Sequence, residues 1–598
     1  MMLRFTLPVL LQLTLFPLAI AFAAATEVVV DNTDKGFTSV PSSAWTVCVN
    51  TADSYGTDYL QCTKNDPWTY AKWTPNIQTA GEYDIYISWP DGENRPDAIS
   101  VIVKDRTGLN KGIKVDQTKN CGKWNLIGRY NLRMSYNSNY ILIQCNDDGN
   151  TAADAVKCVL VSTSVVIAKT TEIVVPTEKS RYPDIPSVVK IVKDNSIGKY
   201  ALTVNGNEFF VKGVCGVEDI EKMHEAGANS ARLYSYVYLN GYDILDRAQD
   251  LGMKLLFGLH MRQENPGFTY AGSKKEVAEQ YTRLISVVDK YKNHPAVLAW
   301  AVGNEVEANT KDVECYKAIN DIARYIKKVD PNHPTVAVLA GSSPEKVQNV
   351  IKYAPEIDIV AVNAYKHLKN AHQNITGPAP KYGGWPGPYL ITEFACNASY
   401  EVITTTWGAP IEQSSYDKAP VYSSRYAAFI TSPSVSGRCI GSYAFKLARV
   451  VGCTHTWYNM LLDSETMKTP IYDEMYFSWT GKYPANMSPR IKIMYLDNKR
   501  AYENIVLSPE TEYRAMVEIT HDEGEQLRYR YELREELHTD LTKQPADIVD
   551  VSMRDDPGDV HAKNITTPST PGYYRLYCYV YDGASGHVGT ANVPFRVK

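Results

Sequence analysis

The chain of 598 residues has an ordinary globular composition, 44% apolar and 22% charged, and is long enough for several hydrophobic cores. Its formal net charge of −5 is small and no Lys/Arg run stands out, which argues against nucleic acid or an anionic membrane as a partner. No CxxC, HExxH or glycine-rich phosphate loop is present, so no metal or other cofactor is implied. The 42 tyrosines and 10 tryptophans fit a carbohydrate-handling protein, because aromatic rings stack on sugars, although β-rich domains also accumulate tyrosine.

The N-terminus has the order of a secretory signal peptide: Arg4, an apolar run over Phe5–Ile20, then Ala21-Phe22-Ala23. We expect a signal peptide over residues 1–23 and a secreted, extracellular protein. A membrane anchor is the alternative, but the run is short for a span and no second apolar stretch of about 20 residues exists. Export predicts disulfides among the eleven cysteines, with a connectivity that stays open. It also agrees with four glycosylation acceptors, at Asn374, Asn397, Asn486 and Asn564.

Residues 26–163 alternate in short β-type segments separated by turn residues, which predicts a β-sandwich. Four stretches of this segment resemble golvesin-type modules, which look like carbohydrate-binding sandwiches: Gly81–Pro90, Val115–Gln117, Gly122–Tyr130 and Ala153–Val156. The resemblance implies a carbohydrate-binding module. A packing domain without a ligand is the alternative, because unrelated functions share sandwich folds.

A Pro- and Thr-rich linker is expected over residues 164–190, and the segment 191–486 then alternates between strand and helix patterns. An Asn-Gly turn predicts a hairpin whose second strand, Phe209–Val214, opens a (β/α)8 TIM barrel. The other seven strand patterns are Asn229–Tyr234, Lys254–His260, Val297–Asn304, Thr335–Leu339, Ile357–Asn363, Tyr389–Glu393 and Cys439–Phe445. Residues 489–598 return to alternation and predict an Ig/fibronectin-like β-sandwich.

Two of the barrel strand patterns end in a carboxylate. Val297–Glu305 is an apolar run that ends in Gly303, Asn304 and Glu305, and Pro388–Phe394 repeats this form with Glu393. The C-terminal ends of barrel strands meet at one mouth, where strands four and seven face each other. Retaining glycosidases need one carboxylic acid to protonate the leaving oxygen and one carboxylate as nucleophile. We assign the acid to Glu305, its pKa raised by the charge of Glu393 and by burial, and the nucleophile to Glu393.

The motif Trp300–Glu305 resembles the strand-four acid/base motif of a large clan of retaining (β/α)8 glycoside hydrolases, and Ile391–Phe394 resembles the clan's nucleophile motif. The similarity runs over residues 209–484. The similarity is greatest to family-two-like barrels and to β-1,3-glucanosyltransferases. This resemblance implies that Arg232 and Tyr365 stand where the clan keeps an arginine and a tyrosine that hold the nucleophile.

Substrate-binding candidates lie at strand ends and in the loops of the barrel. Asn304 is placed to hydrogen-bond a sugar hydroxyl next to the reacting carbon. His260 ends strand three and binds a sugar hydroxyl or satisfies a core hydrogen bond. The aromatic candidates, as sugar platforms or core residues, are Tyr365, Trp385 and Trp457. Arg232 either serves the nucleophile or only neutralises a buried charge.

We therefore expect a retaining β-glycosidase acting on a β-glucan-type polysaccharide or oligosaccharide by double displacement, with β-1,3-glucanosyl transfer as one form of it. We expect a monomer without a membrane span. The alternative is a catalytically degenerate, secreted carbohydrate-binding or matrix protein. It rests on the end of strand eight, where Phe445 begins a stretch that lacks the clan's tryptophan.

Overall fold

The computed structural model describes residues 27–163 and 180–598 except 35, 41, 50–51, 64–65, 78–80, 106–107, 133–138, 146–148, 240–241, 311, 378–382, 448–452, 463–466, 521–526, 537–546, 555–559 and 583–585. The expected signal peptide and most of the expected linker lie outside these residues. The chain divides into two compact units, residues 1–170 and 171–598. None of the described helices is long and apolar enough to cross a membrane.

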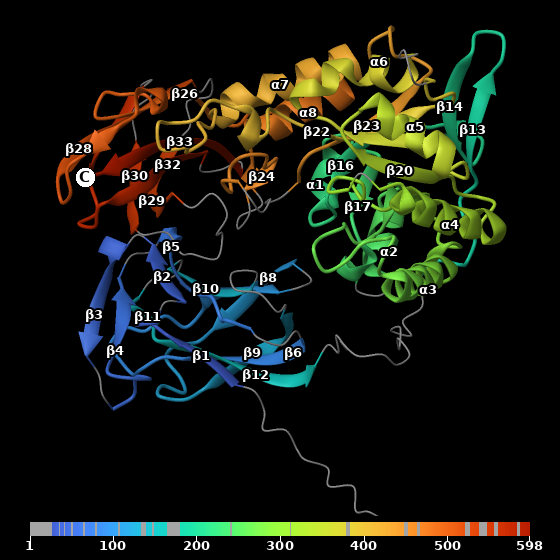
Figure 1. Cartoon of the computed structure of the whole chain (residues 1–598). Coiled ribbons are helices and arrows are strands. Elements are labelled where there is room, and N and C mark those ends of the chain that lie inside the picture. Colours follow the sequence, from blue (N-terminus) through green and yellow to red (C-terminus); the bar gives the residue numbers. More distant parts are fainter. Residues whose placement is uncertain are drawn as a thin grey trace, which may run out of the picture. The chain divides into compact units, whose positions relative to one another are not determined.

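The N-terminal unit is built from antiparallel sheets (Figure 1). A four-stranded sheet has the order β1 (Glu27–Asp31), β12 (Ala155–Thr163), β6 (Gly81–Ser88) and β9 (Asn125–Leu132). A five-stranded sheet has the order β2 (Phe37–Val40), β5 (Asp66–Trp73), β10 (Tyr140–Cys145), β7 (Ile99–Asp105) and β8 (Gly108–Val115). A small sheet joins β11 (Thr151–Ala153), β4 (Asp58–Cys62) and β3 (Trp45–Val49).

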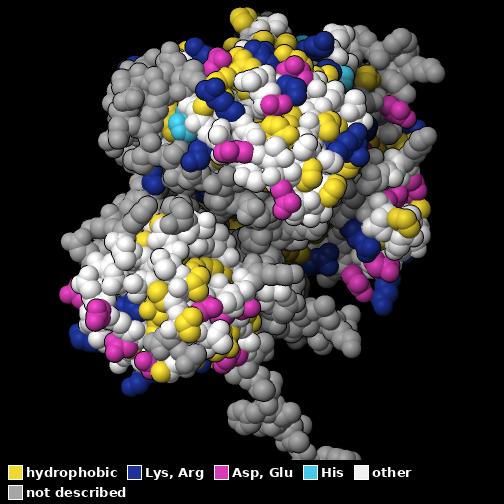
Figure 2. Space-filling view, turned by 90° about the vertical axis from the view of Figure 1, so that its left-hand side faces the viewer, with side chains coloured by type: hydrophobic (Ala, Val, Ile, Leu, Met, Phe, Trp, Pro, Cys, Tyr) yellow, Lys and Arg dark blue, Asp and Glu magenta, His cyan; other side chains and the backbone are white. Residues whose placement is uncertain are grey.

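Strand periodicity explains the core of this unit. In β6, Tyr83, Ile85 and Ile87 are buried while Asp84 and Tyr86 between them are partly exposed, as the two-residue period of a strand requires. The inward residues share one apolar core with those of the five-stranded sheet, Ile99 and Ile141 among them. Figure 2 shows hydrophobic side chains gathered on one outer face of this unit, with acidic side chains at its margin.

The second unit contains a closed barrel of eight parallel strands, and the predicted fold class is thereby confirmed. The strands are β16 (Val211–Cys215), β17 (Ser230–Leu233), β18 (Lys254–Leu259), β19 (Val297–Val302), β20 (Thr335–Ala340), β21 (Ile359–Asn363), β22 (Tyr389–Phe394) and β23 (Cys439–Ala444). The helices are α1 (Ile220–Glu225), α2 (Asp243–Asp250), α3 (Lys274–Tyr291), α4 (Glu314–Val329), α5 (Pro344–Tyr353), α6 (Ala371–Thr376), α7 (Ser415–Phe429) and α8 (Pro470–Thr480). Strands β17, β18, β19, β21, β22 and β23 are buried at every residue, which fits their near-continuous apolar runs.

A small antiparallel sheet precedes the barrel. Its strands are β13 (Val189–Asp194), β14 (Lys199–Val204) and β15 (Asn207–Glu208), and the predicted Asn-Gly turn joins the last two. The predicted opening strand was placed slightly early, because β15 ends at Glu208 and β16 is a separate strand.

The C-terminal part pairs two sheets. One has the order β24 (Leu461–Leu462), β25 (Met467–Lys468), β33 (His587–Val597), β32 (Gly572–Asp582), β29 (Leu527–Glu535) and β30 (Asp547–Arg554), with β27 (Val506–Leu507) also on β33. The other joins β26 (Arg490–Leu496), β28 (Glu512–Thr520) and β31 (Val560–Thr566). Because β24 and β25 come from the loop after β23, the barrel segment itself contributes to the C-terminal sheet.

A buried polar network, called the junction network below, joins the barrel to β32 and β33. Glu412 accepts hydrogen bonds from Lys418 on α7 (2.6 Å) and from Asn592 on β33 (2.7 Å). Arg575 on β32 is fully buried, donates to the Asn592 side chain at 2.6 Å and pairs with Glu536 at 2.7 Å. Burial opposes ionisation of Glu412, but its pKa is lowered because the charge and hydrogen bonds of Lys418 outweigh burial.

The structure does not show the expected disulfides. All eleven cysteines lie within the described residues, and no disulfide joins any two of them. Most are buried in apolar surroundings, and burial raises the pKa of the Cys158 and Cys215 thiols to about 12. Such thiols are poorly reactive, because the thiolate is the reacting form.

Candidate active site

The turn after β19 places Asn304 and Glu305 at the mouth of the barrel. Gly303 has φ +80°, and a Cβ there would meet the Val306 side chain at 2.3 Å, so the tight turn requires glycine. Glu305 has φ +50°, an uncommon value for a residue with a side chain. Two hydrogen bonds fix its backbone: its N–H donates to Val338 O (3.0 Å), and its carbonyl accepts from Gln263 (3.0 Å). Strand β20 and the loop after β18 thus hold a costly conformation of a kind that clusters at functional sites.

Glu393, near the end of β22, lies among three donors from the ends of β17 and β21. Arg232 on β17 donates to Glu393 Oε1 at 2.9 Å and is itself 1% exposed. Tyr234 donates to the same oxygen at 2.9 Å, and Tyr365 donates to Oε2 at 2.6 Å. Both carboxylate oxygens are therefore oriented, and the charge is matched by a buried guanidinium.

Asn363, the last residue of β21, connects the two carboxylates. Its Nδ2 donates to Glu305 Oε1 at 2.8 Å and to Asn304 Oδ1 at 3.1 Å. Arg232 also donates to Asn304 Oδ1, at 2.6 Å. One hydrogen-bonded network therefore contains Arg232, Asn304, Glu305, Asn363 and Glu393, contributed by strands far apart in the sequence.

The two carboxylates have different electrostatic surroundings. The pKa of Glu305 is raised, first by burial and then by the negative charge of Glu393, while the hydrogen bond from Asn363 opposes the rise. Burial is therefore the larger cause, although the charge of Glu393 was predicted to come first. An ion pair at the mouth joins Arg232 to Glu393. Glu305 is thus suited to hold a proton that it can donate.

Aromatic residues form one wall of the mouth. The Tyr365 ring packs edge-on against Phe445 at 5.8 Å, and Tyr458 packs against both. Tyr400 lies in a 3-10 turn, Ser399–Glu401, after β22, and it is 80% exposed.

The turn that carries Tyr400 is anchored next to Tyr365, which donates a hydrogen bond to Glu393. Glu401 accepts from the backbone N–H groups of Ala398 (2.9 Å) and Lys366 (3.2 Å), and Lys366 directly follows Tyr365. The pKa of Tyr400 is raised by desolvation of its hydroxyl and then by the charges of Glu401, Glu305 and Glu393. The charges of both carboxylates therefore act on the Tyr400 hydroxyl.

Three predicted substrate-binding residues are outside this network. Trp385 is buried, and its indole N–H donates to Pro388 O (2.8 Å) just before β22 begins, so it packs at the end of the strand opposite to Glu393. Trp457 is 1% exposed and donates to Asn397 O (2.9 Å), which leaves no ring face for a sugar. Of the two alternatives given for these rings, sugar platform or core residue, the structure places both in the core. His260 is exposed after β18, and no hydrogen bond joins it to either carboxylate among the described residues.

The sequence analysis missed Tyr234 and Asn363, although both gave a signal. Tyr234 is two residues beyond Arg232, so strand periodicity turns both to the same side. Asn363 is an amide that ends an apolar strand pattern, in the same manner as Asn304. The missed Tyr400 gave no comparable signal, because it lies in an irregular turn.

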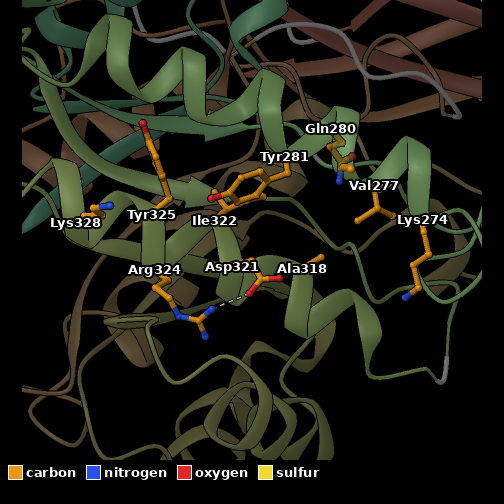
Figure 3. A pocket seen from close by; sticks show the side chains of 11 residues that line it. Lys274, Val277, Gln280, Tyr281, Ala318, Asp321, Ile322, Arg324, Tyr325 and Lys328 are labelled. Atoms are coloured by element: carbon orange, nitrogen blue, oxygen red, sulfur yellow. Dashed lines mark hydrogen bonds and ion pairs between the residues drawn. The ribbon is translucent and has the colours of Figure 1, made fainter.

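A separate hollow lies on the outer face of the barrel between α3 and α4, with a volume of about 480 Å³ (Figure 3). Tyr281 and Tyr325 meet edge to face there at 6.4 Å, and Asp321 pairs with Arg324 at 3.0 Å. Its lining contains one carboxylate and no candidate for a second, so it does not offer two-carboxylate chemistry. Within the described part of the chain, no group of three or more His, Cys, Asp or Glu side chains is placed to hold a metal ion.

The geometry defines a (β/α)8 barrel with a carboxylate pair at its C-terminal mouth, and comparison with known proteins agrees. Residues 199–401 match the "Glycosyl hydrolases family 2, TIM barrel domain" and residues 28–160 match the "Golvesin C-terminal domain". Three curated relatives are a xanthan lyase of Bacillus sp. (strain GL1), a beta-glucuronidase of Sus scrofa and a beta-galactosidase of Thermoanaerobacterium thermosulfurigenes. Their identities to the chain are 36%, 27% and 24%, over 23%, 25% and 34% of its length. The chain covers 15%, 21% and 28% of these relatives, respectively.

Proposed function

We propose that the chain is a retaining β-glycosidase that acts on a β-glucan-type polysaccharide. The observation that carries this proposal is the unequal carboxylate pair: Glu393 is paired with buried Arg232, whereas Glu305 has a raised pKa. The match to the family 2 TIM barrel domain supports the reaction class. The preference for a β-glucan rests on the sequence resemblance alone.

The first step forms a glycosyl ester. An oxygen of Glu393 attacks the anomeric carbon while the bond from that carbon to the glycosidic oxygen breaks, and Glu305 gives its proton to the departing oxygen. Arg232, Tyr234 and Tyr365 hold the attacking carboxylate in one orientation. Asn304, held by Arg232 and Asn363, presents its amide near the reacting sugar.

The second step releases the sugar. Glu305, now a carboxylate, takes a proton from a water molecule or from the hydroxyl of an acceptor sugar. That oxygen attacks the anomeric carbon, and the ester bond to Glu393 breaks. Water gives hydrolysis, and an acceptor gives transfer. We propose that the protein does this outside the cell, on the basis of the signal-peptide pattern at residues 1–23.

The test compares the parent with Glu393→Gln and Glu305→Gln on soluble β-1,3-glucan, β-1,4-glucan and β-mannan, with product analysis. Aryl β-glucosides, β-galactosides and β-glucuronides complete the panel, because two of the relatives are a beta-glucuronidase and a beta-galactosidase. Glu307→Gln is a matched control, since Glu307 lies two residues beyond Glu305 but accepts from Ala340 N–H (2.7 Å) and pairs with Lys346 (3.0 Å).

We expect turnover by the parent and by Glu307→Gln, and a loss of at least about a thousandfold in each of the other variants. For Glu305→Gln the loss is smallest on aryl substrates, whose leaving groups need little protonation. A parent that binds one polymer but turns over nothing on the panel would establish the alternative, a sugar-binding barrel without catalysis.

A further inference from the structure

A row of aromatic and apolar side chains crosses the outer face of the four-stranded sheet of the N-terminal unit. Leu126 on β9, Tyr86 on β6 and Lys157 on β12 are direct register partners on neighbouring strands. Leu126 is 57% exposed, and Tyr86 is partly exposed. With strands about 4.8 Å apart, these positions form a row about 10 Å long.

Two further rings extend this row. The Lys157 ammonium lies over the rings of both Tyr86 (5.4 Å) and Trp124 (4.7 Å), and Trp124 contacts Tyr55 with ring centroids 5.4 Å apart. Tyr55 is 43% exposed. The row of Leu126, Tyr86, Lys157, Trp124 and Tyr55 is called the aromatic row below.

The loops that carry the two outer rings are fixed by buried contacts. The backbone N–H of Tyr55 donates to both carboxylate oxygens of buried Asp154, at 3.2 and 3.0 Å. In the loop before Trp124, Gly122 N–H donates to Trp89 O (2.9 Å) and the Trp89 indole donates to Lys119 O (3.2 Å). The rings are thus held in place before any ligand arrives, which reduces the entropy lost on binding.

The charges of this face indicate what it binds. The strands β1, β6, β9 and β12 carry two basic side chains, and each has an acidic partner: Lys157 with Glu27 at 3.8 Å and Arg129 with Asp84 at 2.7 Å. An acidic polymer would have to compete with these carboxylates. Rings beside paired polar groups suit the apolar faces and hydroxyls of neutral sugars.

We propose that the aromatic row is a binding site for a neutral polysaccharide chain, separate from the active site. That the bound polysaccharide is also the substrate rests on the proposed function. Binding of the polysaccharide at the aromatic row does not. Lys157 fixes the Tyr86 and Trp124 rings by cation–π contact, and Tyr55 and Leu126 present the most exposed apolar surface.

The experiment measures binding of the full chain by sedimentation with insoluble β-1,3-glucan and cellulose, and by affinity electrophoresis in soluble β-1,4-glucan and in xanthan. The variants are Trp124→Ala, Tyr55→Ala and Lys157→Met. Val49→Ala is the matched control, because Val49 is 78% exposed on β3 of another sheet in the same unit. Turnover of a small aryl glycoside is measured in parallel.

We expect the parent and Val49→Ala to bind a neutral glucan, and Trp124→Ala to lose about tenfold in affinity, as loss of an aromatic anchor does. Tyr55→Ala and Lys157→Met should lose less, and small-substrate turnover should be unchanged in all four variants. A parent that binds no neutral polymer, or variants that bind as the parent does, would overturn the proposal. So would a preference for xanthan that Lys157→Met abolishes. Inactivity on the small substrate would overturn the proposed function and leave this binding result intact.

Discussion

The junction network and the barrel mouth both bury charged side chains, and the contrast between them separates stability from catalysis. In the junction network, Glu412 has its own cation, Lys418, and further donors from Thr456 and Asn592. At the barrel mouth, Arg232 forms an ion pair with Glu393, and no ion pair of Glu305 is found among the described residues.

The consequence appears in the direction of the pKa shifts. The pKa of Glu412 is lowered although the side chain is buried, because its partners outweigh burial. The pKa of Glu305 is raised, because burial and Glu393 outweigh the hydrogen bond from Asn363. A buried carboxylate with its own cation and several hydrogen-bond donors stays ionised and serves stability. A buried carboxylate without a cation of its own, such as Glu305, can keep a proton for catalysis.

Apart from the two carboxylates themselves, the largest expected effect comes from removing the cation at the mouth. Arg232→Met leaves Glu393 buried without its ion pair, and we expect kcat on an aryl β-glycoside to fall by about a hundred- to a thousandfold, the equivalent of breaking a buried pair. Arg438→Met is the control, since Arg438 binds Gly387 O at the opposite end of the barrel. Equal losses of activity in the two folded variants would contradict the special role of Arg232.

Removing the junction cation should instead affect stability. Lys418→Met leaves Glu412 buried and unpaired, and we expect the free energy of unfolding to fall by about 3 to 5 kcal/mol. The KM and the pH profile of the folded enzyme should be unchanged. Urea unfolding and steady-state kinetics on the same samples check this. A shifted pH profile would show that the two networks are coupled.

A smaller loss is expected from Tyr365→Phe, which removes one hydrogen bond to Glu393 and keeps the ring in the aromatic wall. Bonds to charged groups contribute about 1.5 to 3 kcal/mol, so kcat/KM should fall by about ten- to a hundredfold. Tyr443→Phe is the matched control, because its buried hydroxyl contacts Ser230 (2.9 Å) inside the barrel. A Tyr365→Phe enzyme as active as the control would rule out a role for this hydroxyl.

The cause of the raised pKa of Glu305 can be tested directly. In Glu393→Gln the neighbouring negative charge is gone, so the pKa of Glu305 should fall but stay above its usual value, because burial is the larger cause. Infrared difference titration of isotope-labelled glutamate measures it without turnover. In the parent, kcat/KM should fall as pH rises through this pKa, since Glu305 must be protonated to act as an acid. An unchanged titration in Glu393→Gln would contradict the stated coupling.

The smallest effect is expected at Tyr400. Tyr400→Ala should raise KM for long oligosaccharides by about three- to tenfold and leave aryl glycosides unaffected, as the loss of one stacking surface predicts. Tyr400→Trp should restore the parent's KM. Tyr502→Ala provides the control, since Tyr502 is also an exposed tyrosine, at 54%. Equal changes in KM for short and long substrates would contradict a platform role.

Residues fixed by strand geometry were predictable from the sequence, and those placed by loops were not. The apolar runs that end in Glu305 and Glu393 determine both the strand and the end at which the carboxylate lies. Trp385 and Trp457 lie in loops, where no periodicity fixes the direction of a side chain, and both rings turned into the core. The junction network could not be predicted either, because Glu412 and Asn592 are 180 residues apart.

The hairpin of β24 and β25 has a consequence for how the protein unfolds. Because Lys468 of β25 pairs with His587 of β33, a strand from the barrel segment completes the C-terminal sheet. If the chain were divided after α8, the C-terminal piece would lack β25 and the junction network would be exposed to solvent. The second unit should therefore melt in a single cooperative transition, and its C-terminal sheets cannot be exchanged as an independent cassette.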